Sequence, residues 1–219
     1  MRNDDFPTKG DKLFIPIDKE AKWLPSGIKD IFKLSEGYRL SAVSLYQEIK
    51  KNEWFNRQYL SSAMVFSFRQ FLEVRLKELI YLGKRELFED PQFKITHNLE
   101  DLFQTYVSEV LPQVDPTYNK EMVSVVNKLI HEFNFIDPKS MSFRYPVDHD
   151  LNPIHNLENF DIDNFKEVMD KLANFFDYQL EILQMLEDYK REFGIRNAMK
   201  QLNRQLEKVA DSFGSIIDI

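Results

Sequence analysis

The chain has 219 residues, of which 43% are hydrophobic and 30% are charged, with a formal net charge of −7 and no cysteine. The lack of cysteine excludes disulfide bonds, thiolate metal sites and a cysteine nucleophile. The acidic charge argues against a global nucleic-acid-binding surface and leaves only a local basic patch. No apolar signal-peptide region follows Met1, and no stretch approaches about 18 uncharged apolar residues, so we expect a soluble cytoplasmic protein without membrane contact.

Residues 1–34 differ in pattern from the rest of the chain. Their apolar runs are short and broken by proline, as in the segment from Leu13 to Ile17. This pattern predicts an extended N-terminal arm with no helix before Ser35. Residues 35–219 are expected to form a single helical domain.

Two long helices are predicted in the first part of this domain. Apolar residues recur at helical spacing over Ser35–Lys51 and again over Trp54–Leu82. The second segment is apolar around a wide face, which is typical of a central helix. Gly83 follows it and is suited to end it.

Two shorter helices are predicted next. One extends from Leu99 to about Val110, where Pro112 is expected to end it. The other is expected to begin at a cap formed by Asp115 and Pro116 and to end near Phe133.

The remaining chain is predicted to contain one long loop and two helices. Residues 134–161 include three prolines and several aromatic residues, which favours a loop ordered against the bundle. Asp163 is expected to cap a fifth helix that ends near Phe193, and a sixth helix with an a/d seam follows over residues 195–213. Together these elements predict an all-α up-down bundle of five to six helices, with an extended N-terminal arm and one long ordered loop.

The loop contains the densest group of polar residues. Three interpretations remain open. Asp148, His149, Asp150 and His155 have the side chains of a divalent metal site. Arg144 and His149 instead suit a phosphodiesterase pair, in which arginine stabilises a charged transition state and histidine transfers protons. In the third interpretation the loop is solvated, with Arg144 anchored to the protein.

Polar residues outside the loop are also candidates. Arg69 and Glu73 lie one helical turn apart, which favours a structural salt bridge unless both face the long loop. His97 precedes a predicted helix and could cap or pack there. Arg196, Lys200, Arg204 and Lys208 form a basic stripe that suits either phosphate contact or a solvated helix face.

Two segments resemble the HEPN superfamily. The central helix of that family carries an ALE-x-x-LK-x-L type pattern, which Leu72-Glu73, Leu76-Lys77 and Leu79 match. A gHdLekL type motif opens the next helix of the family, and His97, Leu99 and Leu102 match it here. The segment from Phe143 to Pro146 is similar to one in some uncharacterised bacterial members.

The resemblance implies an up-down bundle, commonly homodimeric, of a bacterial toxin–antitoxin, phage-defence or RNA-processing system. Active members resemble metal-independent endoribonucleases with an R-x4–6-H motif, which implies Arg144 and His149 as catalytic residues. Tyr145, Arg69 and His97 would then contact the RNA substrate, with no metal and no cofactor. Many members are inactive, so the alternative is a non-catalytic module for dimerisation or for a protein partner.

Overall fold

The computed structural model describes residues 12–13, 24, 27, 30–88, 91–94, 96–148, 150–154, 159–193 and 202–207. The α-helices are α1 (Ile31–Lys51), α2 (Glu53–Phe88), α3 (Leu99–Thr105), α4 (Leu111–Val114), α5 (Lys120–Ile136) and α6 (Ile162–Phe193), and the π-helical segment η3 (Tyr106–Val110) joins α3 to α4. Residues 202–207 are also helical. These described ranges contain no strand, so the predicted all-α helical bundle is confirmed. None of the described helices is long and apolar enough to cross a bilayer.

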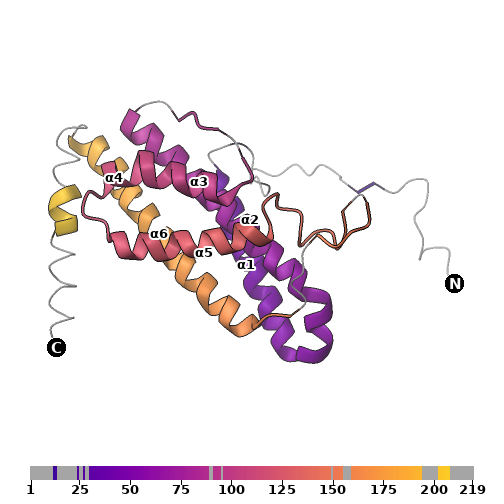
Figure 1. Ribbon diagram of the computed structural model, residues 1–219. Helices are drawn as coiled ribbons and strands as arrows, with labels where there is room; N and C mark the ends of the chain where they lie inside the picture. Colours follow the sequence, from indigo (N-terminus) through magenta and orange to yellow (C-terminus); the bar gives the residue numbers. More distant parts are fainter. Residues whose placement is uncertain are drawn as a thin grey trace.

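Helix α2 is the centre of the bundle. It forms an antiparallel hairpin with α1, and it also packs against α3, η3 and α6 (Figure 1). Contact on several sides explains its wide apolar face, because a helix that is buried all round cannot have a single apolar stripe. Between Met64 and Ile80, its residues other than Phe66, Gln70 and Lys77 are buried. The central position predicted for this helix is therefore confirmed.

The beginning of α1 differs from the prediction. The helix begins at Ile31, four residues before Ser35, so residues 31–34 belong to the bundle. Two contacts explain the earlier start: the ring of Phe32 lies 5.4 Å from the guanidinium carbon of Arg75, and the Ser35 hydroxyl donates to the Phe32 carbonyl over 2.9 Å. Most of the predicted arm lies outside the described residues.

The helical region around η3 also differs from the prediction. Pro112 does not end the third helix; it occupies the first turn of α4, where a missing backbone N–H group is tolerated. The Asp115 carboxylate does not cap the next helix but accepts from the backbone N–H and hydroxyl of Thr117, at 3.2 and 3.1 Å. Helix α5 begins instead at Lys120, after an Asn119 side chain that accepts from the backbone N–H of Met122.

The ends of α5 and α6 were predicted within a few residues. Helix α5 ends at Ile136 rather than near Phe133. The cap of α6 is Asp161 rather than Asp163, because its Oδ1 atom accepts from the backbone N–H groups of Asp163 and Asn164, both at 3.0 Å. In the predicted sixth helix, residues 202–207 are described, and they include the buried Leu202 and Leu206.

Gly83 does not end α2, which continues to Phe88. Its role is to allow close packing against η3. A Cβ atom at Gly83 would overlap the methyl groups of Val110 and lie 3.2 Å from the Cβ atom of Val110. The glycine therefore sets the distance between α2 and the π-helical segment.

This contact predicts that alanine substitutions at two glycines change the free energy of unfolding in opposite directions. Gly83→Ala should lower the free energy of unfolding by about 1–3 kcal/mol, because the new methyl group overpacks the interface with Val110. Gly37→Ala is the matched control: nothing lies within 4 Å of a Cβ atom there, and removing a helical glycine should raise the free energy of unfolding by about 0.5–1 kcal/mol. Urea denaturation followed by circular dichroism measures both, and a stabilising Gly83→Ala would contradict the packing.

Candidate functional site

The partly exposed residues Phe66, Gln70 and Lys77 define one strip on the otherwise buried middle of α2. Their spacing of four and seven residues places them on the same face of the helix. The segment before α3 and the loop after α5 contact this part of α2 through His97 and Ser140. We call these α2 residues, together with His97 and Arg144, the α2 strip.

A buried ionic network lies beneath the α2 strip. The Arg69 side chain is fully buried, and its Nη1 atom lies 3.1 Å from Oε2 of Glu73. Its Nη2 atom donates to the backbone carbonyl of His97, and its Nε atom lies 3.9 Å from Oδ2 of the buried Asp137. Burial lowers the pKa of the Arg69 guanidinium, and the negative charges of Glu73 and Asp137 oppose that effect. The network joins α2, the segment before α3 and the end of α5.

Asp137 also shapes the start of the long loop. Its Oδ1 atom accepts from the backbone N–H groups of Met141 and Ser142, at 2.7 and 2.9 Å. Directly before them, Ser140 adopts a left-handed backbone with a φ of 58°, and its hydroxyl accepts from the side-chain amide of Gln70. Such a backbone costs roughly 1–2 kcal/mol and persists because the surrounding contacts fix it. The first turn of the loop is thus held against α2 at two points.

His97 lies on the surface, and one of its ring nitrogens contacts the buried Glu73. Its Nδ1 atom is 2.8 Å from Oε1 of Glu73, the same oxygen that Nζ of Lys77 approaches at 2.7 Å. Burial by itself would raise the pKa of Glu73, but the hydrogen bonds from Lys77 and His97 and the charge of Arg69 outweigh it and lower the pKa. The ionised carboxylate favours the tautomer with hydrogen on Nδ1. The side chain is 68% exposed, so the proton-accepting Nε2 is left to solvent or a ligand.

Arg144 lies at the other end of the α2 strip. Its Nε atom donates to the backbone carbonyl of Ser140 over 2.9 Å. Its guanidinium carbon is 5.5 Å from the ring centre of Phe66 and 5.9 Å from that of Tyr145, a distance at which cation–π attraction operates. No acidic side chain among the described residues forms an ion pair with Arg144. The exposed guanidinium is therefore oriented by the loop and the aromatic rings.

Four of the five predicted site residues lie on or beside the α2 strip: Arg69 contacts His97, and Arg144 contacts Tyr145. The fifth, His149, lies outside the described residues, so its pairing with Arg144 stays a prediction. Arg69 does face the long loop, which was the condition for counting it as a site residue. It is nevertheless fully buried, so it positions its neighbours, and the predicted direct contact with substrate does not fit the structure.

The metal interpretation of the loop gains no support from the described residues. No group of three histidine or acidic side chains among them could hold a metal ion. Oδ1 of Asp148 instead accepts from the backbone N–H groups of Asp150 and Asn152, both at 2.9 Å, which is a turn-forming role. His149 and His155 lie outside the described residues.

Sequence reasoning missed three side chains of the site. Asp137, Ser140 and Gln70 act through contacts that join residues 68 to 70 positions apart, and a local pattern carries no signal for such pairs. Lys77 was named only as part of the matched family pattern, and its contact with Glu73 places it in the site.

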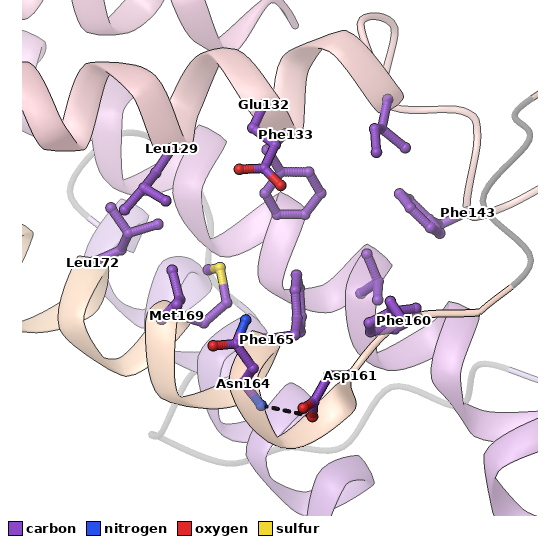
Figure 2. Close-up of a pocket in the computed structure, with 13 residues that line it drawn as sticks. Leu129, Glu132, Phe133, Phe143, Phe160, Asp161, Asn164, Phe165, Met169 and Leu172 are labelled. Atoms are coloured by element: carbon purple, nitrogen blue, oxygen red, sulfur yellow. Dashed lines mark hydrogen bonds between the residues drawn. The ribbon is translucent and has the colours of Figure 1, made fainter.

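A second candidate surface is an apolar groove between α5 and α6 (Figure 2). It has a volume of about 240 Å³. Phe133 of α5 and Phe165 of α6 line it in edge-to-face contact with ring centres 5.9 Å apart, and the ring centre of Phe160 lies 5.5 Å from that of Phe165. Polar side chains stand at its edge, including Glu132 and the capping Asp161. An open apolar groove with a polar rim is suited to bind an apolar side chain of another molecule.

The buried network leads to a prediction about stability. Arg69→Met should lower the free energy of unfolding by about 3–5 kcal/mol, because Glu73 and Asp137 would lose their buried counter-charge. Arg57→Met is the matched control on the same helix: its exposed side chain lies 3.6 Å from Glu53, and such surface pairs contribute about 0–1 kcal/mol. Urea denaturation compares the two variants, and equal effects would show that the buried network does not stabilise the fold.

The chain was also compared with known proteins. No family model matches it, and no curated protein or solved structure matches it either. Function must therefore be inferred from the chemistry of the α2 strip and of the apolar groove.

Proposed function

We propose that the protein binds RNA at the α2 strip and cleaves it without a metal ion, as a HEPN-like protein of a bacterial defence or stress system. The observation that carries the proposal is the exposed His97, whose Nδ1 atom is held by the ionised and buried Glu73. A histidine oriented in this way by a carboxylate is suited to move protons. The cations Lys77 and Arg144 belong to the same strip.

The chemistry needs no cofactor. Nε2 of a neutral His97 removes the proton from a ribose 2′-hydroxyl, and that oxygen attacks the adjacent phosphorus. Negative charge then builds up on the phosphate oxygens, where the Arg144 guanidinium stabilises it. Departure of the 5′-oxygen, which must gain a proton, leaves a 2′,3′-cyclic phosphate. His149 follows Arg144 at the R-x4-H spacing and is the proposed proton donor.

The charge distribution sets the kind of binding to expect. An acidic protein cannot attract RNA over its whole surface, so affinity must come from the local cations. The aromatic ring of Tyr145, which is exposed beside Arg144, adds a stacking surface for a base. Binding is therefore expected to be modest and to weaken as salt is added.

The proposal predicts loss of cleavage when either end of the α2 strip is changed. In buffer with EDTA, His97→Ala and Arg144→Ala should each slow cleavage of a labelled RNA by about 10²–10⁴-fold, because each removes a group that acts in the transition state. The products should end in a 2′,3′-cyclic phosphate, which mass spectrometry identifies.

The matched control is His131→Ala. His131 is similarly exposed and pairs through Nδ1 with Glu100, but it lies on α5 and not on the α2 strip. It should leave cleavage unchanged. Wild-type protein that neither binds nor cleaves RNA, or cleavage that survives His97→Ala, would overturn the proposal.

A second candidate function is dimerisation through the face that α5 and α6 form around the apolar groove. The specific observation is that the apolar stripe of α5 continues beyond the groove residue Leu129 to Met122 and Val125, each 51% exposed. These residues share one helix face at spacings of three and four. A second copy of the chain that packs its own α5 against the groove would cover the groove and the exposed Met122 and Val125.

Dimerisation through this face predicts a mass that depends on concentration. Light scattering from micromolar to near-millimolar protein should show a dimer, and Leu129→Lys should give a monomer because it places a charge in the apolar contact. Leu40→Lys is the control, since Leu40 is an exposed apolar residue of α1. A wild-type protein that stays monomeric over this range would remove the second candidate.

A further inference from the structure

A second cavity, besides the groove between α5 and α6, lies at the beginning of α2. It has a volume of about 760 Å³ and lies between the first turns of α2 and the residues that lead into α6. Val65, Phe143 and Phe160 contribute to its apolar part. Trp54 and Asn159 contribute aromatic and amide surface, so this cavity is more polar than the groove between α5 and α6.

The cavity and the α2 strip are adjacent along α2. Gln58 and Ser62 line the cavity, and Phe66 and Gln70 follow them at intervals of four residues. Each step turns by about 40° around the helix, so the series winds gradually from the cavity to the α2 strip. The cavity residue Phe143 directly precedes Arg144 in the chain. The helical rise separates Gln58 from Gln70 by about 18 Å, so a ligand longer than one nucleotide can contact both regions.

The side chains of the cavity offer the contacts that a nucleobase uses. The indole of Trp54 is 78% exposed and presents a flat surface for stacking. Gln58 and Asn159 each carry an amide donor and an amide acceptor, which suit the edge of an unpaired base. Arg57 also lines the cavity, and its pairing with Glu53 at 3.6 Å is long enough for a phosphate to compete.

We propose that this cavity receives an unpaired nucleobase of the RNA strand whose backbone crosses the α2 strip, so that the substrate is single-stranded RNA. This inference rests on the proposed function. A base inside a duplex is already stacked and paired, so it cannot also stack on Trp54 and present its edge to Gln58 and Asn159. An unpaired base can leave the strand axis and stack there while its phosphate approaches Arg57 or Arg144.

The test uses the fluorescence of Trp54. The chain has two tryptophans, so Trp23→Phe leaves Trp54 as the single reporter. This variant is titrated with an oligonucleotide that carries 2′-O-methyl groups and cannot be cleaved, either single-stranded or annealed to its complement. The single strand should quench Trp54 with saturation, and the duplex should not.

Substitutions then measure what the cavity contributes. Trp54→Ala should weaken single-strand binding about 5- to 100-fold in fluorescence anisotropy, the range for loss of one stacked base. Tyr59→Ala is the matched control, because Tyr59 is an exposed aromatic residue of α2 that does not line the cavity. Both residues are exposed, so neither substitution should affect folding.

The outcomes separate this inference from the proposed function. If Trp54→Ala binds RNA like the wild type while Arg144→Ala binds less, the cavity inference is overturned and RNA binding at the α2 strip stands. Duplex binding as tight as single-strand binding also overturns the inference. If wild type binds no RNA, the proposed function fails, and titration with a nucleoside monophosphate tests the cavity alone: saturable quenching of Trp54 supports it and no quenching overturns it.

Discussion

The buried charge of Arg69 is the constraint on which the site depends. A guanidinium without solvent needs its counter-charges at fixed places, because an unpaired buried charge costs several kcal/mol. Glu73 is on the same helix, but Asp137 and the carbonyl of His97 come from other parts of the chain. Their convergence on Arg69 fixes the segment before α3 and the loop after α5 against α2. The positions of the exposed His97 and Arg144 therefore depend on the buried contacts of Arg69.

Helix α2 carries a second buried arginine with a different task. Arg75 pairs with Glu78 at 2.9 Å and Asp177 at 3.3 Å, and it also contacts Glu36. These partners lie on α2, α6 and α1, so Arg75 connects the helices that form the body of the bundle. The two arginines are six residues apart and face different neighbours. Arg75 connects the helices of the bundle, whereas Arg69 fixes the loop and His97 against α2.

Much of the fold could be predicted because it follows from local periodicity. The central α2 and the long α6 were predicted from apolar spacing, since burial selects that spacing directly. Helix ends were less accurate, because a cap depends on which of two nearby carboxylates reaches the free N–H groups, as with Asp161 and Asp163. Gly83 was assigned to a helix end because the sequence does not show that Val110 lies against it.

The candidate site was predictable only where it coincides with a sequence pattern. His97 and Arg144 were found in this way, but their relation in space was not, because it depends on Asp137 and Ser140, which lie far from α2 in sequence. Arg69 was singled out for its charge. Its burial makes it a positioning residue, and burial of a single side chain is a property of the packed fold that periodicity does not give.

The carboxylate of Glu73 has a consequence for how the site and the fold communicate. Its Oε2 atom faces the interior at Arg69, and its Oε1 atom faces the surface at His97 and Lys77. An anion placed beside His97 and Lys77 changes the charge balance of the same group that neutralises Arg69. Where an anion binds the closed loop more tightly than the open one, its binding opposes local opening of the loop, and opening weakens its binding by the same free energy. Through Glu73, ligand binding at the surface is coupled to the order of the loop.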